Sequence, residues 1–299
     1  MRNERYTNLF CAVIILILSF EPFAQREMKN DKERIEKFKV RRVSEHAGHY
    51  ISGRPEFNTE PSLVTMYDVH GNISEEIIRH EEGYVSAIRK YDDKGNLASE
   101  TYYMRDGAVD SGMSVSYVYK YGEDGNILSK IECSPNGSVY IEYVFEYDSA
   151  GRLITERCAE CPEKIYKYDE KGRLSEISFS DHHTFYKYGD SGELSEKITY
   201  QGPIEEGLIT YRSTYKYDGE RRKLEETDYD HRGSAERKIS YIYDEKGFLT
   251  EERGFYSNID YMCRYSYDTR GLISERTEYE GEDMPVWVIK YVYDYYMKW

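Results

Sequence analysis

The chain has 299 residues, a formal net charge of −15 and 33 tyrosines, and 32% of its residues are charged. The acidic balance makes nucleic acid and anionic membranes poor partners, because their phosphates would be repelled. The tyrosines supply apolar surface that a disordered chain lacks, so the composition favours a folded protein.

The amino terminus has the layout of a secretory signal peptide. Arg2 and Arg5 precede an apolar run from Leu9 to Phe20, and Ala24 offers a small residue at a cleavage point. This run is shorter than the roughly 20 residues that a membrane-spanning helix needs. We therefore expect residues 1–24 to be a signal peptide, with an uncleaved anchor as the alternative. The mature chain is expected to be exported by a bacterial cell, to the periplasm, the cell surface or the medium, without an integral membrane span.

Residues 25–62 are predicted to be a charged lead-in that ends in a first strand. Ile35 and Phe38 have helical spacing, and a strand is expected to begin near Lys39–Ser44. The run Ser52-Gly-Arg-Pro55 is typical of a loop.

A motif related to Tyr-Asp-x-x-Gly-x-Leu recurs through residues 63–299. Its starts are separated by 20 to 30 residues, a period that indicates a repeat architecture. The nine copies begin at Tyr67, Tyr91, Tyr121, Tyr147, Tyr168, Tyr188, Tyr217, Tyr243 and Tyr267, with a partial tenth at Tyr293.

Each copy predicts a hairpin with a tight turn. Asp169 and Gly172 suit the first and fourth positions of a type I turn, and glycine tolerates the left-handed conformation there. This turn places Tyr168 opposite Leu174. The predicted structural turn glycines are Gly71, Gly95, Gly125, Gly151, Gly172, Gly192, Gly247 and Gly271. In the copy at Tyr217, Arg221 replaces the glycine and predicts a longer or distorted turn.

Tyrosines alternate with other residues, as in Tyr117, Tyr119 and Tyr121, which is typical of strands with one packed face. The expected fold class is all-β: an antiparallel sheet of repeated β-hairpins, a repeat array for which coiled or solenoid-like arrangements stay open. Constant turns would line one edge of this sheet and variable connections the other. Loops on a rigid scaffold usually carry recognition, so the variable edge is the expected functional surface.

The motif resembles the YD repeat, also called the Rhs repeat. Tyr147-Asp-Ser-Ala-Gly-Arg-Leu153 and Tyr168-Asp-Glu-Lys-Gly-Arg-Leu174 carry this resemblance, which covers roughly residues 63–299. In that family the repeats form antiparallel sheet that can coil into a shell, and several members are linked to carbohydrate binding. The repeats here run to the last residues, so the resemblance implies a short exported member without the toxin domain of long members. It transfers no catalytic residue.

Four cysteines would remain after cleavage: Cys133, Cys158, Cys161 and Cys263. An even number in an exported protein fits disulfides, and Cys158 with Cys161 is the candidate pair. Free thiols, and metal or redox chemistry at Cys158-Ala-Glu-Cys161, are the alternatives. A closed zinc site would need a second Cys-x-x-Cys or a nearby histidine pair, and the sequence has neither.

Other polar residues suggest structural roles. The adjacent His182 and His183 are expected to be exposed in a variable loop, and on a strand they would point to opposite faces and make a poor chelate. The short Asp-containing turns cannot supply a calcium loop. Glutamates recur eight or nine residues after most motif tyrosines, as in Glu176, which is expected opposite Tyr166. We interpret them as strand residues paired with lysine or a tyrosine hydroxyl, and not as catalytic carboxylates. The sequence therefore predicts no catalytic, cofactor or metal site, and no enzyme.

The leading functional hypothesis is an exported, non-enzymatic scaffold that binds a glycan or a cell-envelope protein through its variable loops. Exposed tyrosines that can stack on sugar rings motivate the glycan form. A structural or assembly module of the envelope is the alternative. An outer-membrane β-barrel is a further alternative, but it needs an outward apolar band about 25 Å tall. Strands such as Leu194–Tyr200 place charge too near the middle for such a band.

Overall fold

The computed structural model describes residues 32–202, 207–257, 259–281 and 283–296. The predicted signal peptide, residues 1–24, lies outside them. Residues 32–38 are helical, and 21 strands form one antiparallel sheet. Among the described residues, no helix has the length and apolarity needed to cross a membrane. The strands are β1 (Val40–Ile51), β2 (Arg54–Phe57), β3 (Leu63–Tyr67), β4 (Ile73–Arg79), β5 (Val85–Tyr91), β6 (Leu97–Tyr102), β7 (Val115–Tyr121), β8 (Ile127–Cys133), β9 (Val139–Tyr147), β10 (Leu153–Cys158), β11 (Lys164–Tyr168), β12 (Leu174–Phe179), β13 (His182–Tyr188), β14 (Leu194–Gln201), β15 (Leu208–Tyr217), β16 (Lys223–Tyr229), β17 (Ala235–Tyr243), β18 (Leu249–Tyr256), β19 (Ile259–Tyr267), β20 (Ile273–Glu280) and β21 (Met284–Tyr295).

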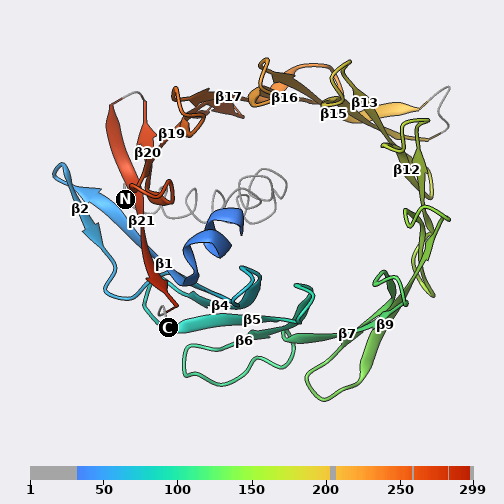
Figure 1. Ribbon diagram of the computed structural model, residues 1–299, viewed down its shortest axis with the longest axis horizontal. Coiled ribbons are helices and arrows are strands. Elements are labelled where there is room, and N and C mark those ends of the chain that lie inside the picture. Colours follow the sequence, from blue (N-terminus) through green and yellow to red (C-terminus); the bar gives the residue numbers. More distant parts are fainter. Residues whose placement is uncertain (1–31, 203–206, 258, 282, 297–299) are drawn as a thin grey trace, which may run out of the picture.

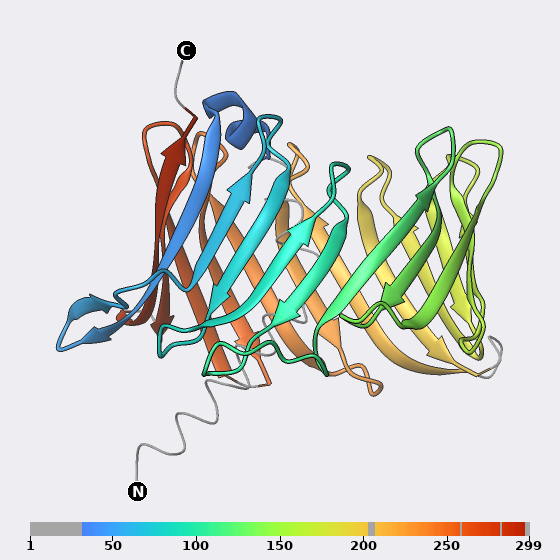
Figure 2. The same cartoon turned by 90° about the horizontal axis from the view of Figure 1, so that it is seen from below.

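The sheet closes on itself. Strand β1 pairs with β3 on one side and with β21 on the other, where the paired residues run from Val40↔Tyr295 to His49↔Trp287. Figure 1 shows the resulting ring, and Figure 2 shows the tilted strands of its wall. Strand β2 pairs only with the end of β1 and projects beyond one rim, so the barrel wall in the described part of the chain has 20 strands.

The predicted fold class is therefore wrong in its architecture: the hairpins form a closed antiparallel β-barrel, not a coiled or solenoid-like array. Closure has a physical reason at the junction of the first and last strands. Val40 and Val43 of β1 are buried together with Ile35 of the helical segment and Leu272. Pairing β1 with β21 also removes the two unpaired edges that an open sheet would present.

The hairpins have the turn that the motif predicts. The Gly172 amide donates to the Asp169 carbonyl oxygen at 2.9 Å, and the Asp169 amide donates to the Arg173 carbonyl oxygen at 2.8 Å. The eight glycines at this turn position have φ angles between 75° and 95°, a left-handed conformation that favours glycine.

The strand register follows the prediction for one pair and then departs from it. Tyr168 pairs with Leu174 as expected, but Tyr166 lies opposite Ile177. The predicted pairing of Tyr166 with Glu176 is wrong because a β-bulge puts one extra residue into the return strand. A register shift directly beside the motif turn occurs in all nine hairpins of the described chain.

The copy at Tyr217 keeps the common turn without its glycine. Arg221 has a φ angle of 65°, and its amide donates to the Asp218 carbonyl oxygen at 3.1 Å. The longer or distorted turn that we expected is not formed, because Arg221 adopts the left-handed conformation itself. Lys223 takes the usual leucine's position opposite Tyr217.

The connections divide between two rims of the barrel. The nine motif turns lie at one rim, called here the turn rim, where residues 32–38 lie inside the ring (Figures 1 and 2). The variable connections and β2 lie at the opposite rim, called here the loop rim, as the alternating direction of antiparallel strands requires.

Candidate functional site

The motif tyrosines face the inside of the barrel. Residues 32–38 lie inside the ring, and Ile35 belongs to a cluster against which Tyr67, Tyr291 and Tyr293 pack. Because side chains alternate along a strand, the residues between these tyrosines face outward. Val118, between two inward tyrosines, is 56% exposed on the outer wall.

The turn residues of the motif have structural partners. The amides of Lys171 and Arg173 donate to Asp169 Oδ1, each at 2.9 Å. Arg173 Nε donates to Asp169 Oδ2 at 2.7 Å, and its guanidinium lies 4.4 Å from the ring centre of Tyr188 in the next hairpin. Similar cation–π contacts join Arg152 to Tyr168 and Arg222 to Tyr243. The motif therefore links neighbouring hairpins along the turn rim.

A buried ionic network covers the inner face of β16 and β17. Glu226 accepts hydrogen bonds of 2.7 Å from both Lys223 Nζ and Arg237 Nη1, and Arg237 also bonds Asp228 at 2.9 Å. Burial alone would raise the pKa of Glu226, but Lys223 and Arg237 hold it below its ordinary value. Tyr241 is 3% exposed beside them. These side chains form core and leave no exposed ring for a ligand.

A second buried group lies further along the same arc, on β18 to β20. Cys263 is fully buried, and burial raises the pKa of its thiol to about 11, so the thiol stays protonated at neutral pH. The Tyr261 hydroxyl donates to Glu252 at 3.2 Å, and burial raises the pKa of this carboxyl group. The arc from β15 to β20 is therefore the part of the wall where inward side chains pack closely.

The inward tyrosines on the opposite arc, β7 to β13, remain partly exposed. We call this set the inner tyrosine arc: Tyr117, Tyr119, Tyr143, Tyr166 and Tyr186. Burial raises the pKa of Tyr119 to about 12, so its hydroxyl is protonated at neutral pH, and it donates to the Leu97 carbonyl oxygen at 2.9 Å. Barrels of about 16 strands or more enclose more space than their inward side chains fill, so these rings border solvent.

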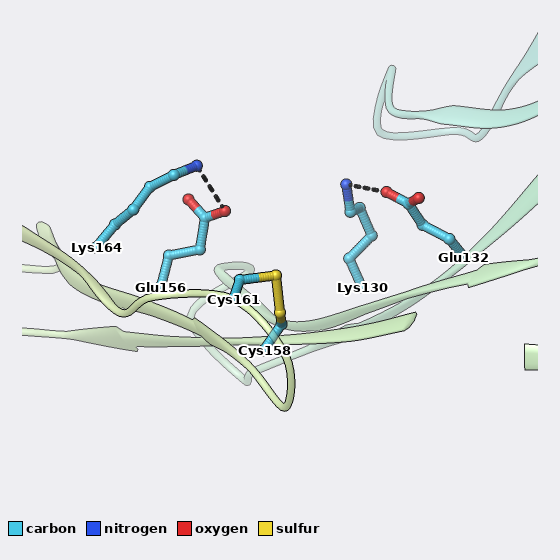
Figure 3. Close-up of a disulfide and its surroundings, with 6 residues drawn as sticks. All are labelled: Lys130, Glu132, Glu156, Cys158, Cys161 and Lys164. Atoms are coloured by element: carbon cyan, nitrogen blue, oxygen red, sulfur yellow. Dashed lines mark hydrogen bonds and ion pairs between the residues drawn. A yellow bond between two sulfur atoms is a disulfide. The ribbon is translucent and has the colours of Figure 1, made fainter. Parts of the chain in front are cut away.

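Two ion pairs lie on the same arc as these rings, and Figure 3 shows both of them. Lys130 Nζ lies 2.8 Å from Glu132 and 4.4 Å from the ring centre of Tyr143. Lys164 Nζ lies 3.0 Å from Glu156, which also accepts a 2.9 Å hydrogen bond from the Tyr166 hydroxyl. No sequence pattern marked Lys130, Glu132 or Lys164 as site residues, and Glu156, nine residues after Tyr147, was expected only as a strand residue. They could have been found from the strand pairing, because they lie opposite inward aromatic residues of neighbouring strands, as Lys130 lies opposite Tyr143.

The structure contains the candidate disulfide, between Cys158 and Cys161, with a Cα–Cα distance of 5.2 Å. It closes the connection between β10 and β11 at the loop rim, beside the Lys164–Glu156 pair (Figure 3). Cys133 and Cys263 are free and buried. The Cys-x-x-Cys sequence thus forms a cross-link in a hairpin loop.

The glutamates eight residues after a motif tyrosine lie on the outer wall, where four of them pair with cations. Those nine residues after it, such as Glu156 and Glu226, face inward. Glu196 lies 2.6 Å from Lys187 Nζ and 2.7 Å from Arg212 Nε. Glu176 lies 2.9 Å from Lys167 Nζ and 3.3 Å from His183 Nδ1. Glu225 and Glu251 each contact two cations in the same way. The predicted pairing with lysine is confirmed for Glu176 and Glu196, whereas Glu251 pairs with Arg253 and Arg264 instead.

A shallow groove of about 440 Å³ lies across β12, β13 and β14. Its outward lining includes Phe185, Ile198, Tyr200 and Lys187. The rings of Phe185 and Tyr200 meet edge to face, with their centres 5.9 Å apart. This groove is a second aromatic surface, on the outer wall.

The adjacent histidines lie on β13 and not in a loop. His183 faces outward toward Glu176, whereas His182 faces inward, 2.9 Å from Asp181. Within the described residues, no group of three or more His, Cys, Asp or Glu side chains has a geometry that could hold a metal ion.

Comparisons with known proteins give weak likenesses. No protein-family model matches the sequence, and no curated protein matches it. The crystal structure of TcdB2-TccC3 is 12% identical over 83% of this chain and 19% of that chain, with a TM-score of 0.38. A porin-like protein from Bacteroides uniformis is 8% identical over 85% of this chain and 98% of that chain, with a TM-score of 0.35. This chain thus spans about a fifth of the first structure. At these TM-scores neither likeness establishes a shared fold or function.

Proposed function

We propose that the chain is a non-enzymatic β-barrel of the bacterial cell envelope that binds a glycan on its inner tyrosine arc. The supporting observation is the difference between two arcs of one wall. The inward side chains of β16 to β20 form a buried ionic core, whereas Tyr117, Tyr143 and Tyr166 on the other arc keep part of their surface exposed.

The chemistry of the arc suits a carbohydrate. A sugar ring has an apolar face of C–H groups that can pack on a tyrosine ring, and hydroxyl groups around its edge that donate and accept hydrogen bonds. The Lys130–Glu132 and Lys164–Glu156 pairs offer ammonium donors and carboxylate acceptors between the rings. An extended glycan could therefore contact several tyrosines and both ion pairs.

A location outside the cytosol agrees with the covalent chemistry of the chain. The Cys158–Cys161 disulfide is the kind of bond that persists in oxidising compartments such as the periplasm or the cell surface. The expected signal peptide, which lies outside the described residues, would deliver the chain there.

A barrel inserted in the outer membrane is the second candidate, and the closed wall favours it. A membrane-spanning sheet can have no free edge in lipid, and the β1–β21 pairing removes the edges that an unclosed sheet would have. Of the alternatives weighed from the sequence, this one gains most from the structure.

The outer wall favours a barrel that stands in water. Strands β4 to β8 have 6 or 7 residues, whereas a spanning strand needs about 9–11 residues. Outward Lys187, Arg212 and Glu196 lie within their strands, and a cation facing lipid at the bilayer centre costs about 2–4 kcal/mol. Ion pairs of this kind recur on the outer wall from β11 to β19, so the described strands of that arc present no continuous apolar band.

A glycan array followed by calorimetry tests the binding proposal. We expect the purified mature chain to bind particular glycans, and Tyr143→Ala with Tyr166→Ala to weaken binding by roughly tenfold or more. Tyr140→Ala, which removes an exposed outward tyrosine from the same strand as Tyr143, is the matched control. A blank array together with one envelope protein recovered in a pull-down would contradict the glycan proposal. Loss of glycan binding on Tyr200→Ala alone would place the site in the outer groove.

Alkaline carbonate extraction of cell membranes distinguishes a barrel that stands in water from one that is inserted in the outer membrane. A barrel standing in water, even one attached to a membrane surface, is released into the soluble fraction. Retention in the pellet, with release only by detergent, would support the outer-membrane candidate.

A further inference from the structure

Exposed apolar side chains are concentrated at the loop rim. Ten large hydrophobic side chains in the described residues are at least half exposed, and eight of them lie at this rim. Val69 at the turn rim and Val118 on the outer wall are the other two. Six of the eight lie in five separate connections around the ring or at the first strand residue after them: Met104, Met113, Val139, Leu208, Ile259 and Met284, which are 50% to 62% exposed.

The arrangement of these side chains indicates a flat partner. They do not form one patch with neighbours in contact, because the strands that carry them are spread around the ring (Figures 1 and 2). The connections that carry them form a single rim, so all of the side chains can meet one plane together. Apolar groups distributed in this way fit the surface of a lipid bilayer better than the compact, contiguous interface of a single protein partner.

The negative charge of the loop rim restricts the kind of lipid surface that it can bind. The described connections of the loop rim contain ten Asp or Glu residues, including Glu81, Asp106 and Asp181, against Arg105 and Arg232 as the basic residues. Anionic lipid would repel this rim, and so would the same rim of a second copy. A bilayer surface without net charge has no such repulsion, and its interfacial region accommodates methionine and branched aliphatic side chains.

We propose that the loop rim docks on a neutral lipid surface, with the barrel standing on the membrane instead of spanning it. Each of the exposed side chains would bury apolar area in the outer part of the bilayer. Because all of them belong to one rigid barrel, their weak individual affinities for the bilayer would combine into a stronger overall affinity. The acidic residues between them would stay in the hydrated headgroup region. This inference does not depend on glycan binding, which concerns the inside of the barrel.

Flotation with phosphatidylcholine vesicles tests the proposal. We expect the mature chain to float with the vesicles, and the sixfold serine variant of Met104, Met113, Val139, Leu208, Ile259 and Met284 to bind at least roughly tenfold more weakly. The control variant replaces six exposed apolar side chains elsewhere with serine, namely Val69, Val118, Leu128, Val144, Leu224 and Ile242, and should float like the wild type. Circular dichroism and thermal unfolding establish that both variants are folded.

Two further measurements distinguish a neutral lipid surface from anionic lipid and from a second copy of the chain. Vesicles containing phosphatidylglycerol should bind the chain more weakly at low salt than neutral vesicles do, because the rim is acidic. Failure of the wild type to float, or equal flotation of the rim and control variants, would overturn the proposal. Concentration-dependent dimers in sedimentation that vanish in the rim variant, without vesicle binding, would assign the rim to a second copy of the chain.

Discussion

The hydroxyl of Tyr188 donates a 2.7 Å hydrogen bond to the carbonyl oxygen of Leu174, the first residue of strand β12. The backbone pairing between β12 and β13 begins only at Glu176↔Phe185, so this side chain extends the contact between the two hairpins toward the turn rim. The same bond recurs in six other pairs: Tyr119–Leu97, Tyr147–Ile127, Tyr168–Leu153, Tyr243–Lys223, Tyr267–Leu249 and Tyr293–Ile273. In these seven places a tyrosine thus fastens a strand to the hairpin before it, and in six of them it is the motif tyrosine.

Replacing Tyr188 with phenylalanine removes this bond while keeping the ring. We expect Tyr188→Phe to lower the free energy of unfolding by about 0.5–1.5 kcal/mol, because the Leu174 carbonyl group loses its partner. Urea unfolding measures the change. Tyr140→Phe, at a tyrosine that is 58% exposed, is the control and should have little effect. Equal effects of the two substitutions would show that the bond contributes nothing.

The turn glycine is predicted to be sensitive to substitution. Gly172 has a φ angle of 77°, a conformation that costs an alanine about 1–2 kcal/mol, so Gly172→Ala should destabilise the fold by about that amount. Gly219 lies in the equivalent turn of another hairpin, and a methyl group there would meet no atom within 4 Å. Gly219→Ala should therefore be nearly neutral. Thermal unfolding compares the two variants, and a neutral Gly172→Ala would contradict the assigned turn.

Local structure could be predicted from the motif, because its determinants are close together in the chain. Asp169 and Gly172 specify the turn, and the turn specifies the pairing of Tyr168 with Leu174. The bulge that follows was not predictable, because no residue of unusual conformational preference marks it. Arg221 shows the opposite case: the expected glycine is missing, yet the neighbouring hairpins hold the chain in the same turn.

Closure and the candidate site depend on contacts between distant parts of the chain. Strand β1 lacks the tyrosine motif, so nothing in its sequence identifies β21 as its partner. The repeats also give the same inward tyrosines on both arcs. The two arcs differ only in how closely these tyrosines are packed. Tyr241 is buried and belongs to the core, whereas Tyr143 is partly exposed and belongs to the candidate site. From the sequence we predicted that the variable edge of the sheet carries recognition. The exposed apolar side chains of the loop rim lie at that edge, but the candidate glycan site lies on the inner wall.

The unfolding free energy is predicted to fall as the pH rises from about 4.5 to 7. Burial raises the pKa of Glu45, on the inner face of β1, to about 7 from an ordinary value of 4.5. In this interval the Glu45 carboxyl group binds its proton more tightly in the folded chain than in the unfolded chain. The stabilisation from Glu45 is therefore complete below about pH 4.5 and is lost as the pH rises to 7. The loss should be on the order of 2–3 kcal/mol. Glu45→Gln should flatten this part of the curve in urea unfolding at several pH values.

Below this interval the dependence should change sign. Burial would raise the pKa of Glu196, but Lys187 and Arg212 hold it below its ordinary value, so protonation on further acidification removes a favourable interaction. A stability that keeps rising toward pH 3 would contradict the outer-wall ion pairs.

Reduction of the disulfide should loosen one part of the wall. The ladder between β10 and β11 contains only the pairs Thr155↔Ile165 and Glu156↔Lys164, and the Cys158–Cys161 bond closes the same hairpin. Closing so short a loop is worth about 2 kcal/mol in the chain-entropy description. We expect Cys158→Ser with Cys161→Ser to speed amide hydrogen exchange in residues 153–168. Residues 249–267 serve as the internal reference, and uniform acceleration across both regions would contradict a local role.

Cross-linking of the first and last strands tests barrel closure most directly. His46 of β1 and Lys290 of β21 are paired across the junction and face outward. In the variant His46→Cys with Lys290→Cys, mild oxidation of the dilute protein should form an intramolecular disulfide, identified by mass spectrometry of its peptides. The control, His46→Cys with Lys120→Cys on the distant strand β7, should form none. A closed barrel predicts cross-linking in most molecules of the first variant. Only intermolecular dimers, or no bond at all, would contradict closure and with it the inner tyrosine arc as an enclosed site.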